Sequence, residues 1–246
     1  MAVYYSGDTA GYSNGPSTAS YFNTPRGLSI DPVISTLAVA DSGNHAIRLV
    51  NTATGETSTL AGADPSSPGS GSVDGTGTIA RFMEPYDVAF APNGDLLVAD
   101  YGNAKLRLIT KQGPNYAVST IITFSSGGSP RGVVVSPDGT FALVSQATDV
   151  ISKITNFQSL SPSMVQLAAL PRIQESGGIF QVPVGLRITP DGNDVLIAGL
   201  ASHRVHKMRS TLTKDCPLQL FCVCHRVRAC LHVNTQTQHT HKWMHA

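Results

Sequence analysis

The chain has 246 residues, of which 41% are hydrophobic and 13% are charged, with 17 Lys plus Arg against 16 Asp plus Glu. This composition is too apolar for a disordered chain and holds too few charges for a coiled coil, and the length suits one large all-β domain or two ordinary domains. No apolar run reaches the roughly 18 residues that span a bilayer, and residues 1–20 lack the basic and apolar regions of a secretory signal. We therefore expect a soluble protein without membrane insertion, and the lack of a signal favours the cytoplasm.

The near-neutral total charge hides two segments of different composition. Residues 1–207 carry 12 basic and 15 acidic side chains, whereas residues 208–246 carry 5 basic and 1 acidic side chain. The second segment also holds all four cysteines, five of the eight histidines and the only tryptophan, and it has no glycine. We therefore divide the chain into a globular body, residues 1–207, and a basic Cys/His-rich tail, residues 208–246, for which disorder is one interpretation.

A short alternating apolar stretch follows a proline four times along the body, at residues 27–30, 87–90, 132–135 and 185–188. Alternation of this kind is typical of a β-strand. In the last three copies the stretch runs into Pro-Asn-Gly or Pro-Asp-Gly, where proline presets φ and glycine takes the positive-φ position of a turn. The first copy has Asp31-Pro32-Val33-Ile34 instead. We therefore expect a longer or irregular turn there.

Further strands are expected after each of these turns. Nearly continuous apolar runs, typical of a strand buried on both faces, lie at residues 37–40, 96–99, 141–144 and 195–198. Third strands are expected at 47–50, 106–109, 151–154 and 205–208, and fourth strands at 57–61, 118–122 and 164–168. Four short antiparallel strands per unit, repeated along the chain, predict the blades of an all-β propeller.

The residues between these strands resemble a known repeat. The first copy has the pattern Phe-x-x-Pro, then Val39 to Arg48 (VADSGNHAIR) and Ser58 to Gly62 (STLAG), and it closely resembles the NHL repeat. The copy from Val98 to Arg107 is nearly as close, whereas the third and fourth copies lack the Asp-x-Gly-Asn turn. The resemblance covers residues 1–207 and implies a β-propeller, commonly of six blades. It does not imply any one function.

The four copies account for four blade cores, which is fewer than a closed ring of this family has. Residues 10–22 match residues 70–82 at an offset of 60, as if the chain began near the end of a blade. We therefore expect an incomplete propeller. The alternative is a small closed propeller in which residues 3–6 supply the closing strand.

Five residues are candidates for binding a partner. In an antiparallel blade, the connection into the first strand and the turn between the second and third strands lie at the same end of the sheet. Arg26, Tyr86 and Arg131 follow the prolines at this end, and His45 and Tyr101 lie in or beside the turns. Arg and Tyr are common anchors in protein interfaces. The alternative interpretation is that these are ordinary residues of the blade rim.

The Asp and Asn residues of the two NHL-like turns are expected to stabilise the turns rather than to bind a metal. Arg48 and Arg107 are expected on the blade surface, paired with neighbouring acids. Residues 11–15 match G-x-S-x-G, but they lie in a glycine-rich loop rather than at the strand-to-helix elbow that a serine nucleophile needs. Cys222, Cys224 and His225 of the tail lack zinc-finger spacing.

These observations favour a non-catalytic binding or scaffolding propeller that presents its loop face to a protein or peptide, with no catalytic residue, metal or cofactor. The alternative, taken from similar propellers, is a metal-dependent lyase or lactonase-like hydrolase, for which the body offers only His45, His203 and His206. An RNA-binding NHL propeller is the second alternative, and the net charge of −3 on residues 1–207 disfavours it, as it does nucleic-acid partners in general. The sequence does not predict an oligomeric state.

Overall fold

The computed structural model describes residues 9–64, 66–67, 69–125, 127–159, 161–167, 183–199 and 204–209. These residues form antiparallel β-strands and three short 3-10 turns, η1 (Ser42–Asn44), η2 (Gly77–Ile79) and η3 (Tyr101–Asn103). None of these helical turns is long and apolar enough to cross a membrane. The predicted all-β class is confirmed.

Each of the four repeats forms one sheet in which the strands lie in sequence order. The first sheet contains β1 (Pro25–Ile30), β2 (Thr36–Asp41), β3 (Ala46–Asn51) and β4 (Thr57–Gly62). The second contains β6 (Pro85–Phe90), β7 (Leu96–Asp100), β8 (Lys105–Gln112) and β9 (Asn115–Thr123), with the short β5 (Gly75–Thr76) beside β9. The third contains β10 (Pro130–Val135), β11 (Phe141–Gln146), β12 (Ile151–Thr155) and β13 (Ser163–Leu167). The fourth contains β14 (Pro183–Ile188), β15 (Asp194–Gly199) and β16 (Arg204–Arg209).

Every strand expected from the sequence is present, and the turns after the first strands follow the predicted chemistry. Gly94, Gly139 and Gly192 have φ values of 86°, 72° and 73°, which are the left-handed conformations that glycine adopts without strain. The turn of the first copy is irregular, because Ser35 takes the left-handed position with φ of 50°. The carboxylate of Asp31 compensates by accepting two backbone N–H bonds within this turn.

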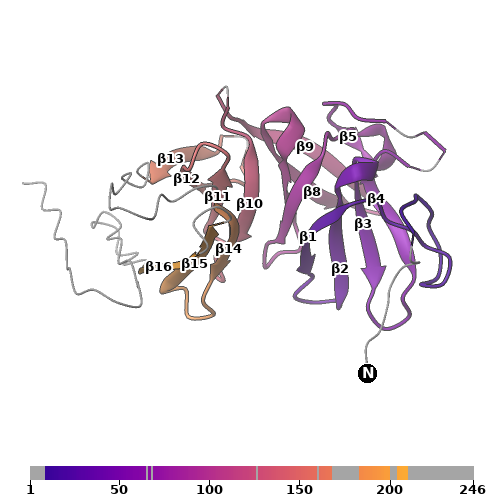
Figure 1. The fold of residues 1–246 in the computed structure, drawn as a ribbon, viewed down its shortest axis with the longest axis horizontal. Coiled ribbons are helices and arrows are strands. Elements are labelled where there is room, and N and C mark those ends of the chain that lie inside the picture. The colour runs from indigo at the N-terminus through magenta and orange to yellow at the C-terminus, as the bar shows by residue number, and fades with distance from the viewer. Residues whose placement is uncertain are drawn as a thin grey trace, which may run out of the picture.

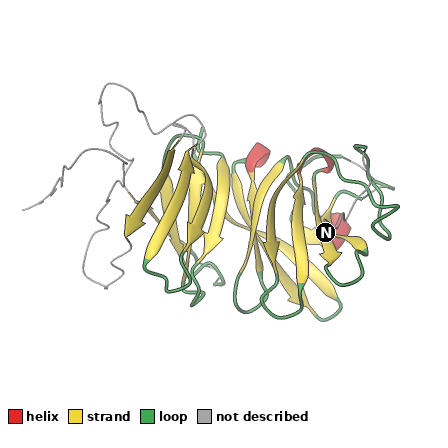
Figure 2. Cartoon of the chain, turned by 60° about the horizontal axis from the view of Figure 1, so that its bottom comes forward, coloured by secondary structure: helices red, strands yellow, loops and turns green. Residues whose placement is uncertain are grey.

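The sheets stack side by side, with the first strands β1, β6, β10 and β14 next to one another (Figure 1, Figure 2). One apolar cluster fills the space between each neighbouring pair of sheets. The first cluster includes Ile47, Leu60, Phe82 and Val98, the second includes Leu97, Leu106, Val133 and Ile154, and the third includes Leu143, Ile151, Leu186 and Ile197. The hydrophobic core is therefore divided into layers between blade-like sheets.

A buried ion pair recurs in the first two sheets. In the first, Arg48 contacts the Asp41 carboxylate at 2.9 Å, and both side chains are fully buried. The other oxygen of Asp41 accepts the backbone N–H of Asn23, and the Asn44 amide donates to the same carboxylate and to the carbonyl of Gly11. The network therefore ties the chain before β1, the turn after β2 and strand β3 together.

The second sheet repeats this network, with Asp74 in place of Asn14 as a further partner of the arginine. Arg107 contacts Asp100 at 2.9 Å, and Asp100 accepts the N–H of Met83 while Asn103 donates to Asp100 and to the carbonyl of Gly71. The prediction that both arginines lie on the blade surface is therefore wrong. Their guanidinium groups are buried because loops 9–22 and 69–82 fold over them and accept their hydrogen bonds through backbone carbonyls.

The third sheet replaces the ion pair by a neutral contact, in which the Gln146 amide donates to the Ser152 hydroxyl at 2.7 Å. In the fourth sheet, Gly199 pairs with Pro183 where Asp41 pairs with Pro25, so no carboxylate is available at that position. The G-x-S-x-G match at residues 11–15 lies in the loop over Arg48, where Ser13 donates its hydroxyl hydrogen to the carbonyl of Ala19. As expected, this segment is a loop rather than a strand-to-helix elbow.

The outward faces of the first and fourth sheets expose positions that are buried between sheets elsewhere. Leu28 of β1 is 52% exposed, whereas its repeat equivalents Val88, Val133 and Leu186 are at most 2% exposed. Val205 of β16 is 65% exposed, whereas its equivalent Leu106 is fully buried. The stack therefore ends in two apolar faces within the described part of the chain. Residues 3–6, the alternative closing strand, and residues 210–246 of the tail lie outside that part.

We expect Arg48→Met to lower the free energy of unfolding by about 3–5 kcal/mol, because Asp41 would be left as an uncompensated buried charge. Lys207→Met is the control, since Lys207 pairs with Asp194 at 2.6 Å but is 41% exposed. Loss of such an exposed pair costs under about 1 kcal/mol. Urea unfolding of the two variants tests this, and similar losses in both would contradict the role of the buried pair.

Leu28 and Leu186 allow a test of the same side chain at the same repeat position in two environments. Leu186→Ala removes fully buried atoms and is expected to cost about 2–5 kcal/mol in the free energy of unfolding. Leu28→Ala, on the outward face, is expected to cost under about 1 kcal/mol. If both substitutions destabilise equally by urea unfolding, the outward face of β1 is covered.

Candidate binding site

The first strands carry a β-bulge directly after each proline, and this bulge sets the direction of the candidate binding residues. In the second sheet Pro85 pairs with Asp100 and Asp87 pairs with Ala99, so Tyr86 between them has no partner in β7. The same irregularity lies between Pro130 and Gly132 of β10, and the register also shifts after the prolines of β1 and β14. Because a bulge re-aims the extra residue, the residues after the prolines point to one common rim. These rim residues are Arg26, Tyr86, Arg131 and Val184.

Four of the five candidate residues form a continuous stack on this rim. The guanidinium carbon of Arg26 lies 3.9 Å from the ring centre of Tyr86. Tyr86 stacks on Tyr101 with ring centres 4.1 Å apart and an interplanar angle of 25°. The guanidinium carbon of Arg131 lies 5.5 Å from the ring centre of Tyr101. We call these four residues the Arg–Tyr ladder, which joins side chains from the first, second and third sheets.

Tyr101 joins the ladder because the turn after β7 is fixed to the start of β6. Tyr101 begins η3, and the N–H of Gly102 in this turn donates to the carbonyl of Met83 at 2.8 Å. Asp100, next to Tyr101, accepts the N–H of Met83 through its carboxylate. The buried ion pair of the second sheet therefore also positions one ring of the ladder.

His45 does not belong to the ladder. It has left-handed backbone, with φ of 56°, and ends the turn η1. Its Nδ1 accepts the backbone N–H of Glu84 at 3.1 Å, which links the first sheet to the segment before β6. This contact occupies one ring nitrogen, so the structure gives His45 a connecting role between two sheets.

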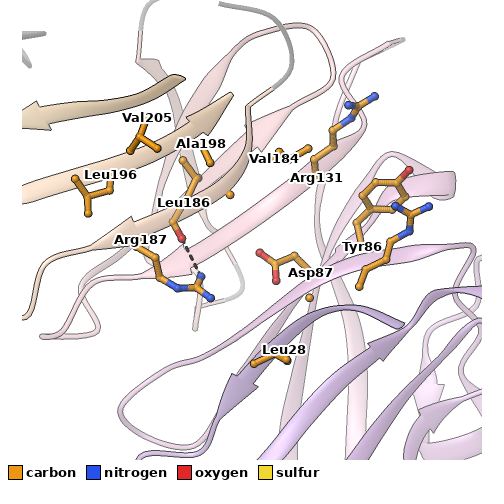
Figure 3. Close-up of a pocket in the computed structure, with 13 residues that line it drawn as sticks. Leu28, Tyr86, Asp87, Arg131, Val184, Leu186, Arg187, Leu196, Ala198 and Val205 are labelled. Atoms are coloured by element: carbon orange, nitrogen blue, oxygen red, sulfur yellow. Dashed lines mark hydrogen bonds between the residues drawn. The ribbon is translucent and has the colours of Figure 1, made fainter. Parts of the chain in front are cut away.

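The ladder borders an open pocket of about 600 Å³ that the first strands line together with β15 and β16. Its lining combines the rim residues with side chains of β1, β6, β14, β15 and β16 (Figure 3). Leu28 lies on one wall, and Leu196 and Val205 lie on the opposite one. Asp87 and Arg187 face each other across the pocket. The site is therefore a largely apolar pocket with a small number of charged side chains in its lining.

Asp87 is a buried carboxylate that the sequence analysis did not single out. Its two oxygens accept the N–H groups of Val88 at 2.9 Å and of Val133 at 3.0 Å, so it bonds across to β10. Burial raises its pKa to about 6, although these N–H groups and the charge of Arg187 oppose the shift. The sequence signal was present, because the other three copies have glycine here, at Gly27, Gly132 and Gly185.

The pocket carries more positive than negative side chains. Arg26, Arg131 and Arg187 line it together with one carboxylate, Asp87. None of the ion pairs in the described part of the chain involves these three arginines. The Nε of Arg131 is buried and has no hydrogen-bond partner. Donor groups are therefore left available at this site.

Among the described residues, no group of three or more His, Cys, Asp or Glu side chains could hold a metal ion. Cys222, Cys224 and His225 of the tail lie outside these residues, as does the side chain of His206.

No family model matches the sequence, and no curated protein matches it. Solved structures do match the fold. An auxiliary nutrient binding protein from Bacteroides thetaiotaomicron aligns over 86% of this chain and 44% of its own, with 14% identity and a TM-score of 0.62. A protein from a nidogen/laminin complex aligns over 75% and 60%, with 15% identity and a TM-score of 0.56. A catalytically inactive virginiamycin B lyase from Staphylococcus aureus, solved with quinupristin, aligns over 81% and 55%, with 12% identity and a TM-score of 0.53.

At these identities the likeness concerns the fold alone. The chain spans between 44% and 60% of the length of these solved chains. The neighbours are propeller proteins, and the chain has the same type of fold, a β-propeller arrangement of antiparallel sheets.

The raised pKa of Asp87 gives a pH dependence with a defined sign. Its folded-state pKa of about 6 lies above the unfolded value, so at intermediate pH the folded state binds a proton that the unfolded state lacks. The free energy of unfolding therefore rises as pH falls from about 7 to about 4, and Asp87 contributes at most about 3 kcal/mol to this rise. Asp87→Asn stays neutral and is expected to lose this part of the pH dependence.

Urea unfolding of the native chain and of Asp87→Asn across this pH range measures the difference. Asp41 and Asp100, whose pKa values burial also raises, are present in both proteins and cancel in the comparison. Identical pH profiles for the two proteins would show that Asp87 is not a buried, titrating carboxylate.

Proposed function

We propose that this protein is a non-catalytic binding propeller that presents its loop face to a protein or peptide partner. The Arg–Tyr ladder carries the proposal. It gathers Arg and Tyr, two of the residue types that dominate binding energy in protein interfaces, at the mouth of an apolar pocket. Stacking restricts the rotamers of all four side chains before a ligand binds, which lowers the entropy lost on binding.

We also propose that the repeats are of the NHL type. The support comes from the residues of the motif itself, because Asp41, Asn44 and Arg48 form one buried network and Asp100, Asn103 and Arg107 form its copy. Such a network forms only when Asp, Asn and Arg stand at this fixed spacing. The Asp-x-Gly-Asn turn and the following arginine are therefore explained by packing rather than by ligand binding.

The enzyme alternative has one observation in its favour, the similarity in fold to a virginiamycin B lyase at 12% identity. The pocket favours binding over hydrolysis or elimination, because both oxygens of its one carboxylate, Asp87, are engaged by backbone N–H groups. The nidogen/laminin neighbour is a protein in a protein complex, which is consistent with a propeller surface that serves as an interface.

Selection of a random-peptide phage library on the full-length protein tests the function. We expect enriched peptides to bind Tyr86→Ala at least about tenfold more weakly, because the substitution removes the central ring, on which Arg26 and Tyr101 stack. Val165→Ala is the control, since Val165 is an exposed residue of β13 that does not line the pocket.

Two outcomes would contradict the proposal. One is a selection that enriches no peptide over an unrelated immobilised protein. The other is a set of enriched peptides that bind the native chain and Tyr86→Ala equally well while both proteins show the same circular dichroism spectrum.

A further inference from the structure

We propose that the pocket takes an acidic segment of a peptide, with one carboxylate held by the guanidinium group of Arg26, another held by that of Arg131, and a neighbouring apolar side chain inserted into the cavity. This inference rests on the proposed function and names the ligand class of the same site.

The charges at the pocket mouth are the first argument. Three arginines line the cavity, and the one acidic residue among them, Asp87, is buried and already accepts two backbone N–H bonds. Arg26 and Arg131 make no ion pair with any residue that the structure describes. An anionic ligand would therefore meet unpaired positive charge rather than displace an existing partner.

The orientation of the arginines is the second argument. The guanidinium carbons of Arg26 and Arg131 lie over the rings of Tyr86 and Tyr101, at 3.9 Å and 5.5 Å from the ring centres. A guanidinium group has five N–H donors in a planar fork, and the donors that point away from the ring match the two oxygens of a carboxylate. The ladder thus presents two oriented donor groups, one at each end.

The wall of the cavity is the third argument. Behind the arginines, the lining is formed by apolar side chains of β1, β14, β15 and β16, which are Leu28, Leu186, Leu196, Ala198 and Val205 (Figure 3). Leu28 and Val205 are 52% and 65% exposed, so a ligand side chain can reach them. Burial of an aliphatic side chain there would add to the electrostatic attraction. The combination favours a ligand that carries acidic and apolar groups side by side.

The same geometry disfavours single-stranded RNA, whose bases are bound by stacking on open aromatic faces. Arg26 and Tyr101 lie 3.9 Å and 4.1 Å from the centre of the Tyr86 ring, so they must occupy its two opposite faces. The ring of Tyr101 in turn contacts the Tyr86 ring and the guanidinium group of Arg131. Both rings of the ladder are therefore already in contact with other side chains, which leaves less open aromatic surface for a base.

Fluorescence anisotropy with labelled probes and the full-length protein tests the inference. The probes are a peptide of alternating Glu and Leu, the same peptide with Gln in place of Glu, the same peptide with Lys in place of Glu, and a single-stranded RNA of random sequence. We expect the Glu peptide to bind at least tenfold more tightly than the Gln peptide, which corresponds to about 1.4 kcal/mol. The Lys peptide and the RNA are expected not to bind, and salt should weaken the binding of the Glu peptide.

Variants then separate the carboxylate contact from a general effect of charge. Arg26→Gln and Arg131→Gln are each expected to weaken binding of the Glu peptide about tenfold and to leave the affinity for the Gln peptide unchanged. Lys111→Gln removes an equal charge from an exposed position on β8 outside the pocket, and it should leave both affinities unchanged.

The other outcomes distinguish failure of the acidic ligand class from failure of the proposed binding function. Equal affinity for the Glu and Gln peptides, with loss of both in Tyr86→Ala, overturns the acidic ligand class and leaves the proposed binding function intact. Binding of RNA but not of the Glu peptide overturns both proposals. If no probe binds, the acidic class is overturned, and the random-peptide selection alone decides the proposed function.

Discussion

The first strands approach each other so closely that one position has almost no room for a side chain in the first and third sheets. A Cβ atom on Gly132 would lie 2.8 Å from the carbonyl oxygen of Val184, and one on Gly27 would overlap the Asp87 carboxylate. This crowding explains glycine at Gly27 and Gly132, whereas a Cβ atom on Gly185 would make only an ordinary contact with Ala198, at 3.5 Å. The bulged residue directly before this position is turned onto the rim, so the constraint that packs the strands together also assembles the Arg–Tyr ladder.

The buried ion pairs of the first two sheets hold the loops that lie next to this rim. Each arginine is bound by backbone carbonyls of the loop that precedes its own sheet, and each aspartate is bound by the N–H of the segment that leads into the first strand. Buried ion pairs contribute little net stability, but their hydrogen bonds fix geometry, and in both networks only the Nε atom of the arginine is left without a partner. Here they fix the loops next to Tyr86 and Tyr101. Core packing holds the sheets, and the charge network orients the loops that join them.

The sequence predicts the strands well because period-two alternation and Pro-x-Gly turns are local signals that later packing does not overrule. It also places Arg26, Tyr86, Tyr101 and Arg131 at one end of the blades, because antiparallel topology decides that. It fails on Arg48 and Arg107, since their burial depends on loops that precede them by 26 to 35 residues. The ladder contacts and the pairing of Asp87 with β10 likewise depend on how sheets pack, which no local pattern contains.

The exposed outward faces of the first and fourth sheets have a consequence for how the molecule unfolds. In a linear array of repeats, stability is close to a sum of intrinsic terms and nearest-neighbour interfaces. The two central sheets each have two such interfaces, whereas each terminal sheet has one among the described residues. In the first sheet the charge network ties the preceding loop to β2 and β3, while the fourth sheet has Gly199 in place of the aspartate. Local opening should therefore begin at β14–β16 and remove one wall of the pocket before the ladder itself is lost.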